Sequence, residues 1–293
     1  MAMNSDIVFC IFSFNRYLYL KNCIDSIETF FPERPVVIYD DNSDQQELLN
    51  YYKDLNAKEN YSIEKIQTVS DQSKHGGLYG LMNLALKNCR EKNYIYSFFI
   101  QDDMQFIQNI DLDAQCRFYF EKYPEALMLS PLFMQKIFLP EIDNYIEKND
   151  GDFFFRNYGV ADAGIIHLGR AKKAALNFSS KGERHNGEKY YKLGYKLLLS
   201  WNPCLAWVPW ALSFKHNKKT GAFLYKKNKL FIKPIDDDNH RKLLHNTQLP
   251  FLEDYCRLNR WWIPKPYIHL IHDVRYIVIS YWKYLRFLIF KNE

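Results

Sequence analysis

Glycine is missing from the first 75 residues of the chain, since none precedes Gly76. Dinucleotide-binding folds and P-loops both place a glycine-rich loop directly after their first strand. This chain therefore has neither fingerprint, and any phosphate group that it binds must be neutralised in another way.

The chain also lacks paired cysteines and uninterrupted apolar runs. Its six cysteines form no C-x-x-C pair, so neither a zinc site nor a disulfide framework is indicated, and a reducing cytosol is the simplest compartment. The few residues before the first strand-like run lack the pattern of a signal peptide, so we expect none here. The longest apolar stretch, near the C-terminus, is interrupted by Arg275, Lys283 and Arg286. We therefore expect a cytoplasmic protein without a transmembrane helix.

Apolar and aromatic residues are abundant instead. Of the 293 residues, 47% are hydrophobic and 17% are aromatic. This is ample for one large domain or two small ones, with aromatic surfaces of the kind that suit sugars and nucleobases. The formal charge of +5 is modest, and the basic residues are dispersed until the last third. This argues against a nucleic-acid partner and favours an anionic ligand or membrane face.

Strand-like and helix-like patterns alternate over the first 110 residues. Apolar residues at helical spacing follow each of the first three strand-like runs. The four runs are Ile7 to Phe12, Val36 to Tyr39, Ile63 to Val69 and Tyr94 to Ile100. Four strands with three intervening helices predict an α/β fold whose mainly parallel sheet is covered by helices on both faces.

Polar residues gather at the ends of three of these strands. They are "SFNR" (13–16), "DDNSD" (40–44) and "QDD" (101–103). Open α/β sheets bind ligands beyond the carboxyl ends of their strands. Adjacent carboxylates on such a loop can hold Mg²⁺ or Mn²⁺ together with water and substrate phosphate. A single acidic run is often only a turn or a helix cap, but three such loops together favour a ligand site.

These segments resemble the inverting family-2 glycosyltransferases of GT-A fold. "IFSFNR" is similar to the end of their first strand, "VVIYDDNSDQQELLN" to the strand and loop that hold the base, and "FFIQDDMQF" to their metal-binding D-x-D segment. The resemblance is good over residues 5–135 and weak over 150–220. It implies a GT-A-like, Rossmann-like fold, a nucleotide diphosphate sugar as donor, with UDP favoured, and Mn²⁺ or Mg²⁺ as cofactor.

The resemblance also implies roles for residues of the three loops. Asp41 would accept a hydrogen bond from the nucleobase, beside the backbone of Phe12 and Ser13. Asp102 would contact the ribose or a metal-bound water, and Asp103 would ligate the metal.

For the other donor-side candidates, a purely structural role is an alternative to donor binding. Asn15 and Arg16 would bind the donor, or simply cap and neutralise the first helix. The arginine that often opens the helix at "GGLYG" is a glycine here, and Lys74 is its substitute unless it lies in a solvated loop. His216 would reach the metal or the diphosphate, with a surface histidine as the alternative. Gln101 stands where the family's pattern is usually acidic, which leaves fewer charges for a cation.

In the second half, the resemblance implies a catalytic carboxylate that takes a proton from the acceptor hydroxyl. Glu183 precedes Gly194 of the "GYK" turn by about the family's offset, although Arg184 stands where the family favours a second acid. Glu188, which lies closer to the turn, and Asp162, in "YGVADAG", are the alternatives.

We expect residues 1–110 to form a nucleotide-sugar-binding half, 111–221 the acceptor and catalytic half of the same domain, and 222–293 a C-terminal extension. The aromatic and basic tail, 273–293, has the composition of a helix on an anionic membrane surface, with a helix packed on the catalytic domain as the alternative. The predicted enzyme transfers a hexosyl or related sugar to a carbohydrate or lipid-linked acceptor. Family habit alone suggests bacterial surface polysaccharide synthesis.

Two other functions stay open. A sugar-1-phosphate nucleotidyltransferase has a related architecture, but it would need the glycine-rich loop that is missing here. A catalytically silent sugar-binding or scaffold protein would share the same fold without turning over a donor.

Overall fold

The computed structural model describes most of residues 5–208 and a few positions beyond. Side chains are described for 5–66, 77–133, 158–200, 202–208, 232, 234–237, 240 and 241, and the backbone alone for 146–149, 153–156, 213–215 and 218–220. Lys74, His216 and the tail 273–293 lie outside the described residues.

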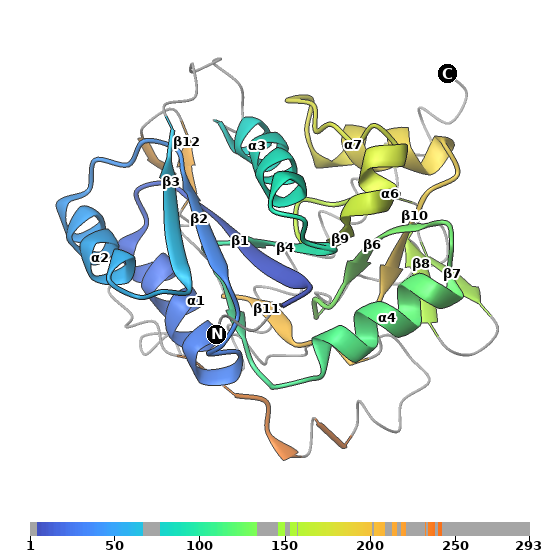
Figure 1. Cartoon of the computed structure of the whole chain (residues 1–293), viewed down its shortest axis with the longest axis horizontal. Coiled ribbons are helices and arrows are strands. Elements are labelled where there is room, and N and C mark those ends of the chain that lie inside the picture. Colours follow the sequence, from blue (N-terminus) through green and yellow to red (C-terminus); the bar gives the residue numbers. More distant parts are fainter. Residues whose placement is uncertain are drawn as a thin grey trace, which may run out of the picture.

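The first half forms the predicted parallel sheet (Figure 1). Its strands are β1 (Ile7–Ser13), β2 (Val36–Asp40), β3 (Tyr61–Lys65) and β4 (Tyr96–Gln101). They pair in parallel in the order β3-β2-β1-β4. The helices between them are α1 (Tyr17–Phe30), α2 (Gln46–Asn56) and α3 (Leu78–Glu91). The α/β prediction is therefore confirmed.

The second half continues the same sheet in the order β4-β9-β6-β10-β8-β7. The added strands are β6 (Ala126–Ser130), β7 (Ile146–Asn149), β8 (Phe153–Arg156), β9 (Gly164–His167) and β10 (Lys196–Leu199). The helices are α4 (Leu112–Lys122), α6 (Leu168–Lys173) and α7 (Glu183–Lys192). Strand β9 runs antiparallel to both of its neighbours, β4 and β6.

Two short antiparallel ribbons complete the described strands. One pairs β5 (Met104–Phe106) with β11 (Leu205–Trp207), and the other pairs β12 (Ser213–Lys215) with β13 (Lys218–Thr220). Strand β5 follows the acidic "QDD" segment directly, and the N–H of Val208, after β11, donates to the carbonyl of Asp103 at 2.8 Å. The chain therefore returns to the acidic segment about a hundred residues later in sequence.

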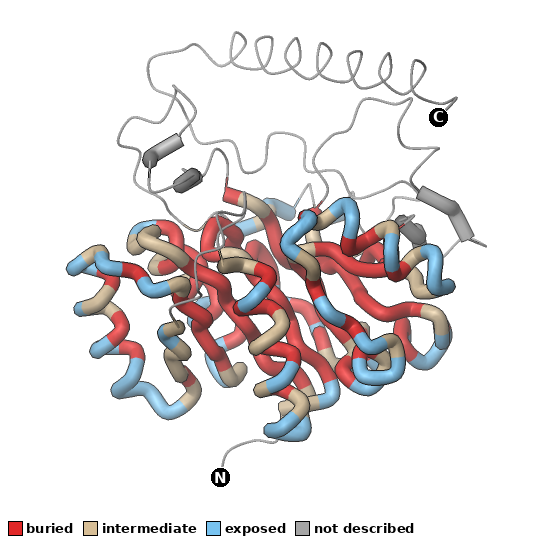
Figure 2. The backbone as a smooth tube through the Cα atoms, turned by 90° about the horizontal axis from the view of Figure 1, so that it is seen from above, coloured by how far each residue is buried: buried red, intermediate tan, exposed pale blue. Residues whose placement is uncertain are grey.

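Both faces of the sheet are buried, as continuous apolar runs require. Successive residues of a strand face opposite sides. On β1, Ile7, Phe9 and Ile11 join one core with α1, α2 and α4, whereas Val8, Cys10 and Phe12 join a second core with α3, α6 and α7. Figure 2 shows the buried strands in the interior and exposed residues along the outer surfaces of the helices. The result is a three-layer α/β/α arrangement.

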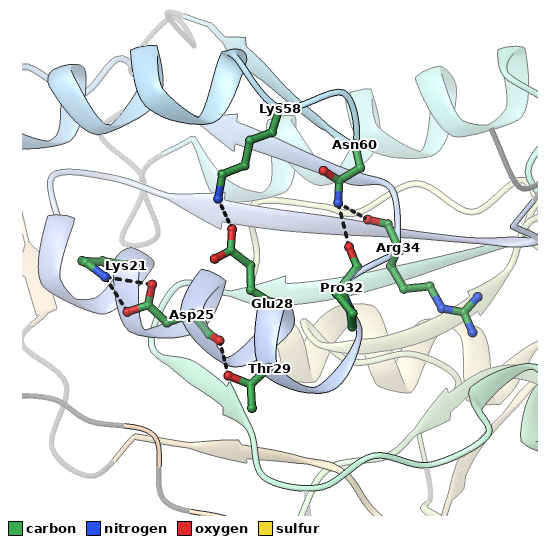
Figure 3. Close-up of polar contacts among 8 residues, drawn as sticks. All are labelled: Lys21, Asp25, Glu28, Thr29, Pro32, Arg34, Lys58 and Asn60. Carbon is green, nitrogen blue, oxygen red and sulfur yellow. Dashed lines mark hydrogen bonds and ion pairs between the residues drawn. The ribbon is translucent and has the colours of Figure 1, made fainter. Parts of the chain in front are cut away.

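The amino-terminal edge of the sheet is closed by contacts between connecting loops (Figure 3). The side-chain amide of Asn60 donates to the carbonyls of Pro32 and Arg34 at 3.0 and 3.2 Å. Lys58 pairs with Glu28 of α1. The amide anchors backbone groups, while exposed ion pairs of this kind contribute about 0–1 kcal/mol.

The carboxyl edge contains a topological switch point. The chain leaves β1 toward β2 on one side, whereas β4 lies on the other side of β1. Loops that follow β1 and β4 therefore diverge, and open α/β sheets bind their ligands at such a point. All three polar loops, 13–16, 40–44 and 101–103, lie at this edge, where β1, β2 and β4 end.

A short part of the C-terminal extension packs against this domain. Ile235 contacts the cluster of Ile107, Phe133 and Ala206, and its N–H donates to the carbonyl of Ile107 at 2.9 Å. His240 Nδ1 lies 2.9 Å from Gln108 Oε1. Among the described residues, no helix has both the length and the apolar character needed to cross a bilayer.

Candidate functional site

The three polar loops are joined through their backbones. The N–H of Asp102 donates to the carbonyl of Phe12 at 3.2 Å, and the N–H of Asp41 donates to the carbonyl of Ser13 at 3.1 Å. These bonds extend the β4-β1 and β1-β2 ladders by one step past the strands. The acidic ends of β2 and β4 are thus held on either side of the end of β1.

Asp102 and Asp103 share one guanidinium. Arg16 Nη1 lies 2.7 Å from Asp102 Oδ1 and 3.0 Å from Asp103 Oδ2. The second oxygen of Asp102 accepts a hydrogen bond from Ser13 Oγ at 3.0 Å. Residues of the first loop therefore neutralise and orient the acidic pair of the third loop.

Burial dominates the electrostatics of this cluster. It raises the pKa of Asp102, against the opposing effect of the Arg16 charge. Burial also raises the pKa of Asp103 to about 6, which Arg16 opposes and Asp102 reinforces. Burial alone would lower the pKa of Arg16, but the two carboxylates raise it above its usual value. One buried cation thus faces two buried acids, which leaves the cluster short of positive charge.

One carboxylate oxygen in the cluster is available to a ligand. Asp103 Oδ1 is buried and accepts no hydrogen bond from the described residues. Mg²⁺ and Mn²⁺ are commonly held by one or two carboxylates, with water and phosphate in the other positions. The pair therefore fits such an ion, with Asp103 as the ligand. No group of three or more potential ligands occurs within the described part of the chain.

The other acidic pair is Asp40 and Asp41, and its two members differ in burial and in hydrogen-bond partners. Asp40 is fully buried and accepts hydrogen bonds from the N–H and hydroxyl of Ser43 at 2.7 and 2.5 Å and from the hydroxyl of Tyr52 at 2.7 Å. Asp41 is only partly buried, and its Oδ2 accepts from the N–H of Gly77 at 2.9 Å, directly before α3. Asp40 therefore shapes the turn, while Asp41 lies between the end of β2 and the start of α3.

Asn15 has a capping role, but on a different helix from the one expected. It adopts a left-handed conformation with φ of 51°. Its side-chain oxygen accepts from the N–H groups of Asp44 and Gln45 at 2.9 and 3.1 Å, at the start of α2. In return, the side-chain oxygen of Gln45 accepts from the N–H of Tyr17 at 3.0 Å, at the start of α1. The first two loops thus cap each other's helices.

Asp162 reaches the same edge because of the antiparallel strand β9. Phe99, near the end of β4, pairs with Gly164, at the start of β9. The residues before β9 therefore lie beside those that follow β4. Asp162 Oδ2 accepts a hydrogen bond from the hydroxyl of Tyr79 at 3.1 Å. Tyr79 belongs to the first turn of α3, so α3 contacts both Asp41 and Asp162 through its start.

Glu183 also affects the pKa of Tyr79. Burial raises the pKa of Tyr79, and the charges of Asp162 and then Glu183 raise it further. The two acids expected on the acceptor side are therefore neighbours of one phenol.

Two glycines fix α7, which begins at Glu183, against the loop that carries Asp162. The N–H of Gly159 donates to the carbonyl of Gly187 at 2.9 Å. A Cβ at Gly159 would lie 2.5 Å from Tyr190 Cβ, and one at Gly187 would lie 2.6 Å from Tyr158 Cγ. Only glycine allows this approach at either position.

Glu188 lies elsewhere on α7. It pairs with Arg184 at 2.6 Å, one helical turn away, and the side chains of Arg184 and Glu188 are 76% and 42% exposed. Among the candidate bases, Asp162 and Glu183 are thus brought together, and Glu188 is engaged in a surface pair.

Sequence reasoning missed Tyr79 and the pairing of Arg16. Tyr79 has a signal in hindsight, since it is a polar-tipped residue in the first turn of a helix that begins at the carboxyl edge. Arg16 was singled out, but as a donor ligand or a helix residue. The sequence does contain a signal for this ion pair. One basic residue, Arg16, follows β1, and two acids, Asp102 and Asp103, follow the neighbouring strand β4.

No protein-family model matches the chain, and no curated protein matches its sequence. Similar solved structures include S. aureus TarS 1–349 in complex with UDP, at 14% identity and a TM-score of 0.47, covering 68% of this chain and 59% of that one. GalNAc-T7 with UDP, GalNAc and Mn²⁺ is similar at 10% identity and a TM-score of 0.48, covering 69% and 42%.

The mannosyltransferase PcManGT from Pyrobaculum calidifontis, in complex with GDP-Man and Mn²⁺, is similar at 11% identity and a TM-score of 0.47, covering 70% of this chain and 57% of that one. The chain thus spans less than two thirds of the length of each of these three proteins.

Proposed function

We propose that the chain is a GT-A-like glycosyltransferase that moves a sugar from a nucleotide diphosphate donor, UDP-type favoured, to a carbohydrate or lipid-linked acceptor. The observation that carries this proposal is the gathering of acids at one edge of the sheet. Asp41 follows β2, Asp102 and Asp103 follow β4, Asp162 precedes β9, and Glu183 opens α7. The motif resemblance of the first two groups supports the same assignment.

On the donor side, Asp41 accepts a hydrogen bond from the nucleobase beside the end of β1. Asp103 would ligate Mn²⁺ or Mg²⁺ through its Oδ1, and Asp102 would contact the ribose or a metal-bound water. The start of α3 adds helix N–H groups that favour phosphate. A divalent cation, when bound, stabilises the charge that develops on the departing diphosphate. Arg16 is the protein's own cation at this point, and its guanidinium suits phosphate oxygens.

On the acceptor side, Glu183 takes the proton from the attacking hydroxyl, as an inverting displacement requires. Asp162 is the second candidate, because Tyr79 links it to the same place. Glu188 comes third, because it already pairs with Arg184. Phe12 and Ser13 contribute backbone, Asn15 holds the two loops in place, and Lys74 and His216 stay candidates for the diphosphate and the metal.

The proposed cellular setting rests on composition and on the family resemblance. We place the protein in the cytoplasm, at the inner face of the membrane, with 1–110 and 111–221 as the two halves of the catalytic domain. The tail, 273–293, docks on anionic lipid through its basic and aromatic residues. The habit of the resembled family alone supports a role in the synthesis of bacterial surface polysaccharide.

A thermal-shift screen of UDP-, GDP-, CMP- and dTDP-sugars, with and without Mn²⁺, tests the proposal most directly. We expect one donor class to raise the melting temperature, more so with Mn²⁺, and to be turned over in the presence of an acceptor. Release of pyrophosphate from a nucleoside triphosphate and a sugar-1-phosphate would indicate a nucleotidyltransferase instead. Donor binding without hydrolysis or transfer to any acceptor would indicate the silent sugar-binding protein.

A further inference from the structure

Arg16 lies where the acidic pair would hold a shared cation. One nitrogen, Nη1, is within hydrogen-bond distance of a carboxylate oxygen of both Asp102 and Asp103. Its side chain is 15% exposed, and those of the two acids are 4% and 12% exposed. The positive charge between the two carboxylates is therefore already present in the protein itself and largely shielded from water.

The guanidinium is held at one end only. Nη2 and Nε of Arg16 make no hydrogen bond to the described residues, and its Cζ lies 5.7 Å from the centre of the Tyr19 ring. Two of its three nitrogens thus stay available for a second anion. The Asp103 oxygen that does not contact Arg16, Oδ1, is buried without a hydrogen-bond donor from the described residues.

We infer that Arg16 competes with the divalent cation for the Asp102–Asp103 pair, and that the diphosphate of the donor relieves this competition by binding the guanidinium. The free protein then binds the cation weakly, and the protein with a nucleoside diphosphate binds it tightly. This inference rests on the proposed function for the identity of the diphosphate, and on the structure alone for the competition.

The physical reason lies in the charge balance. Two carboxylates carry two negative charges, whereas Arg16 and a divalent cation together carry three positive ones. At close range in a shielded site, the two cations repel each other strongly. A diphosphate supplies at least two further negative charges and accepts paired hydrogen bonds from a guanidinium. With it present, both cations are neutralised in the same place.

This competition makes the binding of the cation and the binding of the donor cooperative. Because coupling between two ligands is reciprocal, the cation must tighten the nucleoside diphosphate by the same factor by which the diphosphate tightens the cation. Arg16 is then a positioning and coupling residue. A nucleoside monophosphate, with fewer charges and one phosphate less, should produce a smaller effect.

The experiment measures Mn²⁺ affinity of the full chain from the EPR signal of free Mn²⁺, alone and with UDP or UMP. In the wild type we expect UDP to tighten Mn²⁺ within the roughly 5–150-fold range of coupled sites, and UMP to do so less. Arg16→Gln should bind Mn²⁺ alone about tenfold tighter than the wild type, and UDP should then add little. Arg16→Lys keeps the charge and should stay as weak as the wild type.

Arg34→Gln is the matched control. Arg34 also pairs with a partly buried aspartate, Asp113, but near the start of β2 and thus at the opposite edge of the sheet. We expect its Mn²⁺ affinity and UDP response to equal those of the wild type. If Arg16→Gln unfolds without metal, the increase of its melting temperature with added Mn²⁺ is measured in place of the Mn²⁺ affinity. A larger increase of the melting temperature than in the wild type supports the competition, and an equal or smaller increase contradicts it.

Two results would overturn the inference. One is an Arg16→Gln variant that binds Mn²⁺ no more tightly than the wild type. The other is a wild type that binds both Mn²⁺ and UDP without either changing the affinity of the other. Failure of the proposed function gives a different pattern, in which the wild type binds no nucleotide at all. A gain of Mn²⁺ affinity in Arg16→Gln would support the competition even then.

Discussion

Two pairs of adjacent aspartates end neighbouring parts of the same sheet, and they are used in different ways. In the pair after β2, Asp40 is satisfied by its own turn, through three hydrogen bonds from Ser43 and Tyr52. In the pair after β4, Asp102 and Asp103 are held by a cation from another loop, and one oxygen of Asp103 has no hydrogen bond from the described residues. Identical sequence signals can thus serve the fold or the site.

This difference predicts how the acids respond to the loss of their charge. An acid that serves the fold should lose stability when it is replaced by its amide, with little direct effect on chemistry. When an acid that serves the site is replaced by its amide, ligand binding or catalysis should weaken, with little effect on stability. The same amide substitution, applied to four acids of this edge, therefore separates the two classes.

The largest effect is expected for Glu183→Gln. The change removes the proton acceptor but keeps the size, so transfer should fall by about 10² to 10⁴, as is typical for loss of a general base. Donor affinity and unfolding free energy should stay close to those of the wild type. Single-turnover transfer, donor titration and urea unfolding measure the three quantities.

Glu188→Gln is the matched control, because Glu188 lies on the same helix in a surface pair. Normal transfer by Glu183→Gln together with impaired transfer by Glu188→Gln would reverse the assignment. If neither change slows transfer, Asp162→Asn becomes the decisive variant.

The second effect concerns Asp103→Asn, which should abolish the response of donor binding to Mn²⁺. The unfolding free energy should be unchanged or higher, because the change removes a buried charge with an incomplete set of hydrogen bonds. Mn²⁺-dependent donor hydrolysis and urea unfolding are the measurements. Asp113→Asn, at the other edge, should retain the Mn²⁺ response. Wild-type Mn²⁺ stimulation in Asp103→Asn would contradict the assignment of this residue as the ligand.

The third effect is on stability alone. Asp40→Asn should lower the unfolding free energy by about 1–3 kcal/mol, because the buried amide cannot accept all three hydrogen bonds. Tyr52→Phe removes one of those bonds and should cost less. Urea unfolding of both variants and their double mutant measures the coupling. Equal stability of Asp40→Asn and the wild type would show that the turn does not depend on this carboxylate.

Much of the fold was predictable from the sequence, and much of the site was not. The strands β1, β2 and β4 lie in buried runs bounded by polar loops, so local pattern was sufficient to find them. The insertion of β9 between β4 and β6 depends on pairing between distant segments, which no local pattern encodes. That insertion is what brings Asp162 to the carboxyl edge.

The same limit applies within the acidic pairs. Apart from the family resemblance, nothing in "DDNSD" distinguishes Asp40 from Asp41, because their roles depend on distant partners. These partners are Tyr52, in the second turn of α2, and Gly77, at the start of α3. Likewise, the partner of Asp102 and Asp103 lies 86 and 87 residues earlier in the chain. The residue types were predictable, but their division between fold and chemistry required the three-dimensional neighbours.

The smallest effect, and the sharpest test of the first pair, is expected for Asp41→Asn. Asparagine can still accept the hydrogen bond from the N–H of Gly77, so the start of α3 should be preserved. It presents an amide in place of a carboxylate to the nucleobase, and we expect about tenfold weaker donor binding, equivalent to about 1.4 kcal/mol. The Mn²⁺ response should be retained. Asp44→Asn, an exposed neighbour in the same loop, is the control. Calorimetric titration of the donor into both variants measures the difference. Unchanged donor affinity in Asp41→Asn would show that this aspartate, like Asp40, serves only the fold.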